Sequence, residues 1–406
     1  MSYKNVVVTG ISMLNAAGLD LQTSWQNIKD GKSCIDKITL FDTSELETKI
    51  AAQISEDFGP IATKMLPKRD KKQMTRATQM GVVAGINAIV DSGIDFAKCE
   101  KERVAVIMGV ITSAYNERER GISESSIIVK SMPNAPSAWL SLLYGLEGPN
   151  FNCSTACASS AYALSLGCDL IKLDKADVVI IGGADSHIDQ ECIRGFNQIL
   201  ALSIRNDSPK TACRPFTKTR DGFVIGEGAG VMILESEEHA RKRNAKIYCK
   251  IAGYAITSEA FNIVSPKDDG VGMTKTMRMA LKDANLNPEQ VNYINAHGTS
   301  TYVNDRYETM AIKNVFGENA YKIPVSSTKS MIGHTIGAAG VIEGIVTIMS
   351  INENIVTPTI NYMDPDPDLD LDYIPNASRP HNVDVGISNS FGFGGHNATI
   401  VYQRYK

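Results

Sequence analysis

The feature of this sequence that most constrains its fold is a series of short, almost uninterrupted apolar runs rich in β-branched residues. Glycines lie at the ends of these runs, and stretches with a helical pattern lie between several of them. Strands that are apolar on both faces are typical of sheets covered by helices on both sides. The sequence therefore predicts an α/β fold. The runs cover residues 6–11, 104–108, 178–181, 231–234, 247–251, 323–325 and 399–402.

A similar order of patterns occurs twice along the chain. Residues 151–172 and residues 323–351 each read as a strand, a tight turn and a helix with small residues on every side. A helix of that kind is buried, because small side chains let neighbouring backbones approach closely. We interpret the pattern as a duplication of two α/β halves, covering residues 1–240 and 241–406.

The composition fits a globular protein with a substantial core. Of 406 residues, 43% are hydrophobic and 21% are charged, with a net charge of -4. This balance gives no reason to expect nucleic acid as a partner. The apolar run at residues 6–8 is too short for a signal peptide, and no stretch approaches roughly 18 uninterrupted apolar residues. We therefore expect a cytosolic protein without a membrane span.

The cysteines do not form a metal-binding pattern. None of the eight belongs to a CxxC pair, and no histidine cluster supplies zinc spacing. We expect reduced thiols in a reducing compartment and no metal site. The eight are Cys34, Cys99, Cys153, Cys157, Cys168, Cys192, Cys213 and Cys249.

One cysteine has a local context that suits a nucleophile. Cys157 lies in the run STACASS, just before the helix expected in the first of the two repeated patterns, residues 151–172. At a helix N-terminus, unpaired N–H groups and the helix dipole favour thiolate over thiol, and the thiolate is the attacking species. The alternative from the local sequence is a cysteine packed in the core.

Two histidines also lie in motifs that suit a site. His297 follows an apolar strand in the motif NAHGTST, and His334 ends the motif SSTKSMIGH. Loops after strands carry the sites of many α/β proteins. Lys329 and Glu343 lie in otherwise apolar stretches, where charges are costly unless paired, so we expect them to pair. A turn-capping histidine and a structural ion pair are the alternatives.

Glycine-rich segments follow in two further places. The C-terminal motif SNSFGFGGHN allows a close backbone approach to a ligand, and its N–H groups can serve an oxyanion; a simple turn is the alternative. Residues 220–230 are also rich in glycine, but their spacing fits neither GxGxxG after a strand nor GxxxxGK[ST], which excludes a nucleotide loop.

Taken together, these motifs resemble the β-ketoacyl-acyl-carrier-protein synthases of the type II class, within the thiolase-like superfamily. The resemblance covers nearly the whole chain, from VVVTG at residues 6–10 through FDTS at 41–44 to the C-terminal glycine loop. It implies a duplicated thiolase fold with α-β-α-β-α layers and a dimer. It also implies an acyl carrier protein as partner, and neither a metal nor a redox cofactor.

The resemblance implies roles for individual positions. Cys157 matches the acylated cysteine, and His297 and His334 match the pair that binds the malonyl thioester carbonyl. Lys329 matches a supporting lysine and Glu343 its acidic neighbour. The other positions that it assigns are Thr299 and Thr301 for the phosphopantetheine arm, Phe391 and Phe393 for the glycine-loop gate and oxyanion hole, and Lys68, Arg69, Lys72 and Arg205 for carrier docking.

The same resemblance implies a reaction and weighs against three rivals. The implied reaction is the decarboxylative Claisen condensation of malonyl carrier with an acyl group on Cys157. A degradative thiolase would need a second cysteine near the C-terminus, and none follows Cys249. An initiating synthase has Asn where His334 stands, and a non-catalytic chain-length factor lacks the nucleophile.

Some positions differ from the residues that the fatty-acid synthases of this class usually carry. Thr112 stands where a bulky aliphatic residue usually bounds the acyl pocket, Asn262 where many such synthases carry histidine, and Ser160 where glycine is common. Residues 121–136 also match poorly. The departures leave two readings open: a fatty-acid enzyme, or the ketosynthase of a specialised polyketide system such as those for aryl polyenes, which pairs with a chain-length factor.

Overall fold

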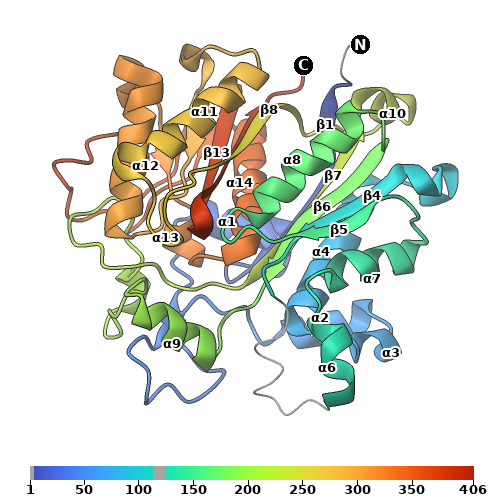
Figure 1. Cartoon of the computed structure of the whole chain (residues 1–406), viewed down its shortest axis with the longest axis horizontal. Coiled ribbons are helices and arrows are strands. Elements are labelled where there is room, and N and C mark those ends of the chain that lie inside the picture. Colours follow the sequence, from blue (N-terminus) through green and yellow to red (C-terminus); the bar gives the residue numbers. More distant parts are fainter. Residues whose placement is uncertain (1–3, 113–123) are drawn as a thin grey trace.

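Ten strands form a single mixed sheet in this computed structural model, which describes residues 4–112 and 124–406. Their order across the sheet is β10-β9-β13-β14-β8-β1-β7-β6-β4-β5. Figure 1 labels β13 and β8 of this sheet and the strands from β1 to β5 in that order. The strands are β1 (Val6–Asn15), β4 (Val104–Gly109), β5 (Asn150–Cys153), β6 (Val178–Asp185), β7 (Gly228–Ser236), β8 (Cys249–Ser258), β9 (Tyr293–Asn295), β10 (Val325–Ser326), β13 (Val385–Gly392) and β14 (His396–Gln403).

The ten strands divide into two sets of five with the same topology. We call β1-β7-β6-β4-β5 the first half-sheet and β8-β14-β13-β9-β10 the second half-sheet. In each set, counted from the middle of the sheet, the first two pairings are antiparallel and the last two are parallel. The predicted α/β class and the duplication are therefore present in the structure.

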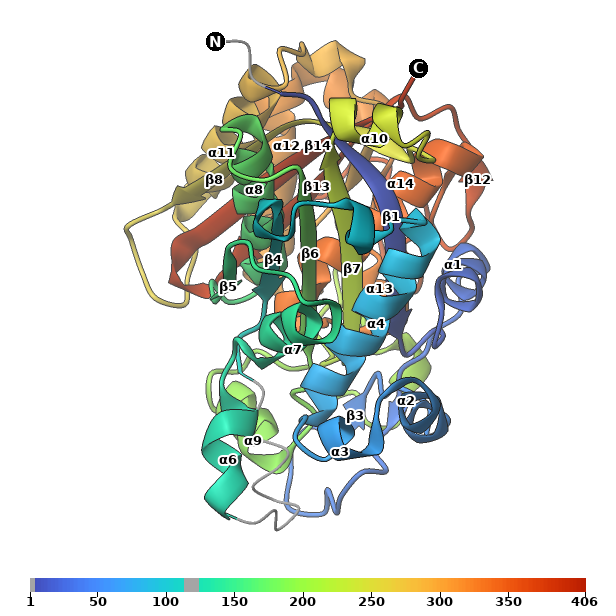
Figure 2. The same cartoon turned by 90° about the vertical axis from the view of Figure 1, so that its right-hand side faces the viewer.

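Helices cover the half-sheets in layers. Helices α8 (Ser159–Lys172) and α14 (Ala339–Glu353) pack against each other and contact both half-sheets, so they form the middle layer. Two helices lie on the outer face of the first half-sheet: α4 (Arg76–Ser92) and α7 (Ala135–Tyr144) (Figure 2). On the outer side of the second half-sheet lie α11 (Val271–Asp283) and α12 (Tyr302–Phe316). This arrangement gives the five expected layers.

The two half-sheets are not separate. The first residues of β1 pair with β8 in antiparallel register, from Val6 with Ile251 to Val8 with Cys249. Beyond this short junction the half-sheets diverge, and the middle helices fill the space between them. The N-terminal apolar run therefore joins the two halves as well as lying at the centre of the first.

The middle helix of the second half is unusually apolar. Within the described residues, one segment, Ile336–Glu353, is long and apolar enough to cross a membrane by length and composition alone. However, 89% of that segment is buried inside the structure. Its apolar character is explained by its place between two half-sheets, where a helix contacts protein on every side.

The remaining elements are short and lie mainly at the ends of the layers. A hydrogen-bonded pair joins β2 (Asp36–Lys37) to β3 (Ile50–Ala51), and another joins β11 (Ile355–Val356) to β12 (Arg379–Pro380). The other α-helices are α1 (Leu21–Lys29), α2 (Phe58–Met65), α3 (Lys68–Lys71), α6 (Glu124–Ser131), α9 (Gln190–Gln198), α10 (Glu237–Lys242) and α13 (Lys329–Ile332).

Candidate active site

Cys157 lies at the N-terminus of the middle helix α8, as its sequence context predicts. The helix begins at Ser159, and Ala158 is the residue that caps it. The turn before the helix is strained, since Ala156 has a φ of 49°, which is uncommon for a residue other than glycine. The Ser159 hydroxyl holds this turn by accepting the Thr155 N–H at 2.9 Å and donating to the Ala156 carbonyl at 2.6 Å.

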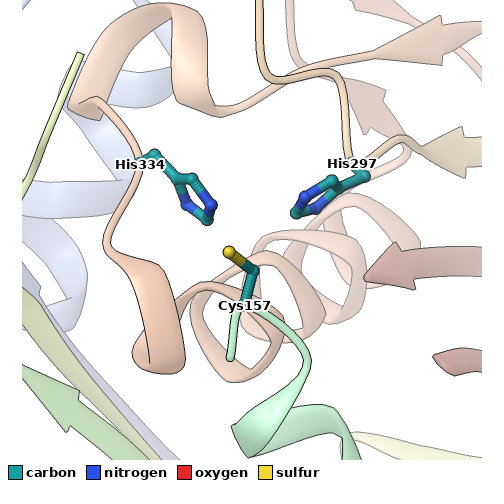
Figure 3. Close-up of side chains that lie close together, drawn as sticks. All are labelled: Cys157, His297 and His334. Atoms are coloured by element: carbon teal, nitrogen blue, oxygen red, sulfur yellow. The ribbon is translucent and has the colours of Figure 1, made fainter. Parts of the chain in front are cut away.

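The two histidines approach this cysteine from the other half of the chain. His297 follows strand β9, and His334 follows helix α13. The Cys157 sulfur and one nitrogen of each imidazole lie within 4.8 Å of one another, with the sulfur directed between the rings (Figure 3). The ring centroids are 5.3 Å apart and the rings are almost perpendicular, at 83°. The structure therefore brings together three residues that lie up to 177 positions apart.

The hydrogen bonds of the imidazoles fix their tautomers. Lys329 Nζ donates to Nδ1 of His297 at 3.3 Å, and the Ile336 N–H donates to Nδ1 of His334 at 3.2 Å. An Nδ1 that accepts a hydrogen bond leaves the proton of a neutral ring on Nε2. Both rings therefore present an Nε2–H donor. Nε2 of His334 is buried and has no hydrogen-bond partner within residues 4–112 and 124–406.

The two rings are held in the neutral state. Burial lowers the pKa of both histidines well below the ordinary value, and the Lys329 ammonium lowers it further. At neutral pH each ring is therefore an uncharged hydrogen-bond donor. Two such donors aimed at one point suit an oxygen atom on which negative charge develops during a reaction.

The predicted pair of Lys329 and Glu343 is present. The two side chains are fully buried and form an ion pair behind His297. Burial raises the pKa of Glu343 to about 7, and the charge of Lys329 opposes that effect. Because a buried charge is costly unless it is compensated, the pair keeps the Lys329 ammonium in place beside Nδ1 of His297.

Glu308, which our sequence reasoning missed, supports the His297 loop. Its carboxylate accepts the backbone N–H groups of His297 and Gly298, each at 2.8 Å. Burial raises the pKa of Glu308 to about 7. In the sequence this residue looks like an ordinary polar position of helix α12; only its complete burial indicates its role.

The resting cysteine is a thiol, contrary to our expectation. Burial raises the pKa of Cys157 to about 12, although the Lys329 charge opposes the change. We expected the helix N-terminus to favour the thiolate, but the loss of solvent outweighs that effect. At neutral pH the Cys157 sulfur therefore carries its proton.

The glycine-rich segment lies against the backbone of Cys157. Its first part is not a loop but the end of strand β13, which continues to Gly392. A Cβ atom at Gly392 would lie 2.9 Å from the Thr155 carbonyl oxygen and 3.2 Å from the Cys157 nitrogen, so a larger residue would displace this backbone. Gly394 and Gly395 have φ values of 81° and 71°, which favour glycine. The segment then turns back into strand β14.

A cavity of ≈ 530 Å³ connects these groups. Cys157, both histidines, Phe391 and Phe393 line it, and the Phe391 ring lies 6.0 Å from His297. Thr299 and Thr301 also line the cavity, and their hydroxyl groups share a hydrogen bond of 2.8 Å. The structure thus places seven of the predicted site residues around one space: Cys157, His297, His334, Phe391, Phe393, Thr299 and Thr301.

Thr112 lies next to a lining residue of the cavity. The residue from this segment that lines the cavity is Ile111, and Thr112 is not among the lining residues. Neighbouring side chains of a chain segment that leaves a strand point to different sides. The described wall beside Cys157 therefore includes the bulky aliphatic residue Ile111, and the role of Thr112 in the acyl pocket stays a prediction. Of the poorly matching residues 121–136, residues 121–123 lie outside the described part of the chain.

The predicted docking residues lie apart from the reacting groups. Lys68 and Arg69 are exposed on α3, Lys72 is exposed at its end, and none of the three lines the cavity. Arg205 is half-buried and forms an ion pair of 3.4 Å with Asp221, a lining residue. Arg205 is therefore the docking candidate nearest the cavity, and the role of all four remains a prediction.

Cys157, His297 and His334 could by spacing alone hold a metal ion. Their protonation does not suit one. A metal would need the lone pair of Nε2 on each imidazole, but that nitrogen carries the proton in both rings, and a buried ammonium lies 3.3 Å behind His297. The arrangement fits an anionic oxygen better than a cation.

Fold and site together define a condensing enzyme with a Cys-His-His centre. Residues 3–240 match the N-terminal domain of beta-ketoacyl synthases, and residues 248–363 match their C-terminal domain. The chain belongs to the beta-ketoacyl synthase family. It is therefore an acyltransferase that forms carbon–carbon bonds.

Individual relatives agree over their full length. The chain is 42% identical to a 3-oxoacyl-[acyl-carrier-protein] synthase 2 of Synechocystis sp., covering 99% of each sequence. It is 39% identical to the synthase 2 of Vibrio harveyi, covering 100% of this chain and 99% of the other.

Solved structures include enzymes of polyketide systems. The ketosynthase complex AntDE:AntF, with a type II acyl-carrier protein, has a TM-score of 0.90 at 32% identity and covers 100% of each chain. The ketosynthase ApeO, solved with its chain length factor ApeC from Xenorhabdus doucetiae, has a TM-score of 0.85 at 28% identity and covers 99% of this chain and 98% of the other.

Proposed function

We propose that this enzyme condenses a malonyl unit, presented on an acyl carrier protein, with an acyl group held on Cys157. The observation that carries the proposal is the cluster in Figure 3, in which the Cys157 sulfur and one nitrogen of each neutral imidazole lie within 4.8 Å of one another. Both rings present an Nε2–H donor, and the cluster lines an apolar cavity. The cluster offers a nucleophile and a separate binding point for a second carbonyl oxygen.

In the first half-reaction the cysteine takes up the acyl group. Its sulfur attacks the thioester carbonyl of the acyl carrier, the carbon–sulfur bond to the carrier breaks, and the thiol proton leaves with the carrier sulfur. The N–H groups of Cys157 and Phe393 stabilise the tetrahedral oxyanion. Losing one such donor costs on the order of 3 kcal/mol. The close contact of Gly392 with the Cys157 backbone supports this oxyanion hole.

In the second half-reaction the histidines act. His297 and His334 donate their Nε2–H groups to the carbonyl oxygen of the malonyl thioester. Carbon dioxide then leaves, and its bonding electrons form an enolate whose oxygen the two donors stabilise. The enolate carbon attacks the Cys157 thioester, a carbon–carbon bond forms and the bond to sulfur breaks. The Cys157 thiolate takes a proton from solvent, and the β-ketoacyl carrier leaves.

Residues around the cluster bind the acyl carrier protein and its phosphopantetheine arm. Thr299 and Thr301 hold the phosphopantetheine arm, and the basic residues Lys68, Arg69, Lys72 and Arg205 attract the acidic carrier. The reaction as written needs neither a metal nor a redox cofactor. The protein acts in the cytosol as a dimer.

Two pathways fit this reaction. The full-length relatives at about 40% identity are synthases of the 3-oxoacyl-carrier type, which favours fatty-acid elongation. The structures of AntDE:AntF, of ApeO with ApeC, and of the ishigamide ketosynthase with its chain length factor favour a second candidate, the catalytic subunit of a polyketide or aryl polyene heterodimer. Relative kcat/KM for octanoyl and polyenoyl carriers separates the two pathways.

Separate assays of the two half-reactions test the proposal. His297→Ala and His334→Ala should each lower the release of carbon dioxide from malonyl carrier, while acyl transfer to Cys157 continues. The expected loss is between about 10²- and 10³-fold, the range for removing one donor to an oxyanion. If both variants decarboxylate malonyl carrier at the wild-type rate, the roles of the histidines are wrong.

A further inference from the structure

A buried carboxylate outside the reacting groups joins the two halves of the site. Asp185, at the end of strand β6, is fully buried. One oxygen accepts the Gly337 N–H at 2.7 Å, and the other accepts the Ile111 N–H at 3.4 Å. Gly337 belongs to the turn after His334, and Ile111 lines the acyl cavity. One side chain thus contacts both the malonyl-binding loop and the cavity wall.

The turn that Asp185 contacts is strained and fixes His334. Ile336 has a φ of 50°, which is a rare conformation for a β-branched residue. The N–H of the same residue donates to Nδ1 of His334. Strained conformations of this kind persist only where the surroundings hold them. The hydrogen bond from the next residue, Gly337, to Asp185 provides such a hold.

The approach of Asp185 to the turn depends on a glycine. A Cβ atom at position 337 would lie 2.3 Å from the carboxylate oxygen Oδ2 of Asp185. Any other residue at this position would have to displace the carboxylate or the turn. The short N–H to oxygen contact and the glycine that permits it are therefore two separate signs that the carboxylate and the turn belong together.

His187 supports the carboxylate from the other side. Its Nε2 lies 3.1 Å from Asp185 Oδ1, and its Nδ1 lies 3.7 Å from the sulfur of Cys192 on helix α9. A buried carboxylate is costly without a partner, and a hydrogen-bonded imidazole reduces that cost. The network continues to the cavity, since Phe196 of α9 is a lining residue.

We propose that Asp185 is a positioning residue for the condensation step. It holds the turn whose Ile336 N–H selects the Nε2–H tautomer of His334, and it holds Ile111 in the wall beside the acyl group. His187 keeps the carboxylate in place. The inference rests on the proposed role of His334 in decarboxylation, and it concerns a side chain that touches neither substrate.

The substitution Asp185→Asn tests this role. The amide keeps the size of the side chain but replaces one acceptor oxygen with an NH₂ group, which cannot accept an N–H. Decarboxylation of malonyl carrier should fall between about 10- and 100-fold, the loss expected for a displacement on the order of 1 Å at a reacting group. Acyl transfer to Cys157 should fall clearly less than decarboxylation, because that step does not use His334 and depends on Asp185 only through the longer contact of 3.4 Å with the Ile111 N–H.

Asp189→Asn is the matched control. Asp189 is also buried, but its carboxylate accepts the Cys192 N–H at 2.8 Å and caps helix α9. Because asparagine caps a helix about as well as aspartate, this variant should leave the ratio of the two half-reaction rates at its wild-type value. If Asp185→Asn does the same, or changes neither half-reaction, the inference is overturned.

A second variant tests the same role through a different residue. If Asp185→Asn does not fold, His187→Gln should lower decarboxylation selectively and to a smaller extent; equal effects on both half-reactions would again overturn the inference. The wild-type enzyme is measured in the same assay. Absence of decarboxylation there would contradict the proposed function itself, which separates that failure from a failure of the inference.

Discussion

At the scale of single residues, the site depends on buried groups whose charge state is set by their partners. Lys329 and Glu343 compensate each other, and Glu308 holds the backbone of the His297 loop. Neither histidine is charged at neutral pH, since burial and Lys329 lower both pKa values. The imidazoles are therefore available as donors without any prior proton transfer.

Glu308 makes the stability of the protein depend on pH in a defined direction. Its pKa is raised from the ordinary value of 4.5 to about 7 in the folded protein. A group with a raised pKa stabilises the fold at low pH, and that contribution is lost as the pH rises through the folded value. Between pH 5 and pH 8 the loss from this group alone is roughly 3 kcal/mol.

The variant Glu308→Gln removes this contribution. The free energy of unfolding in urea should therefore decrease less between pH 5 and pH 8 in the variant than in the wild type. Glu238→Gln, at an exposed position of α10, is the control and should keep the wild-type dependence. An unchanged dependence in Glu308→Gln would show that this carboxyl group does not titrate in the predicted range.

Which single residues could be predicted depends on whether their roles are local. Cys157, His297 and His334 lie in short motifs, and the pairing of Lys329 with Glu343 followed from the cost of isolated charges. Glu308 and Asp185 act through tertiary contacts with backbone groups far away in the sequence, so no local pattern reveals them.

At the scale of elements, the middle layer explains the small residues of α8 and α14. Gly340 of α14 faces Ala161 of α8, and a Cβ atom there would lie 3.0 Å from it. The Ser160 hydroxyl of α8 accepts the N–H of Val341 at 3.0 Å. It thereby satisfies a donor in the first turn of α14, which has no partner within its own helix.

A matched pair of glycine substitutions tests the packing of this layer. In Gly344→Ala, the new Cβ atom would lie 2.2 Å from the Tyr402 hydroxyl oxygen and 2.9 Å from Met232. Overpacking of this kind costs about 1–3 kcal/mol, which outweighs the gain of about 1 kcal/mol in helix propensity. Gly195→Ala, in helix α9 with open space around it, should instead stabilise the protein.

Urea denaturation of the two variants gives the comparison. Gly344→Ala should unfold at a lower urea concentration than the wild type, and Gly195→Ala at the same or a higher one. Equal stability of both variants would mean that α8, α14 and the strands around them can shift to accommodate an extra methyl group. The small residues of the middle layer would then not be required for close packing.

The elements themselves were predicted unevenly. Strands such as β1 and β6 appear as continuous apolar runs because both of their faces are buried. Strand β13 was missed, since its second half carries the polar and glycine-rich motif SNSFG and reads as a loop. Its polar side chains are buried near the site, where tertiary contacts replace the usual apolar pattern.

At the scale of the whole molecule, the duplication divides the chemistry between two halves. The nucleophile comes from the first half and both donors come from the second, while β1 and β8 join the halves in one sheet. The order of the strands in the sheet could not be predicted from the residue patterns. Apolar runs show that strands exist, but they do not show which strands pair. The family resemblance supplied the layers.

The central claim is that Cys157 alone carries the acyl group. Eight cysteines are available, and Cys157 is the one that joins both catalytic histidines in one cavity. The enzyme is incubated with octanoyl carrier without malonyl carrier, digested, and mapped by mass spectrometry, with Cys157→Ala in parallel. We predict one octanoyl group, on the peptide containing Cys157, and none in the variant. Octanoylation of another cysteine, or β-ketoacyl formation by the variant at the wild-type rate when malonyl carrier is then added, would contradict the account.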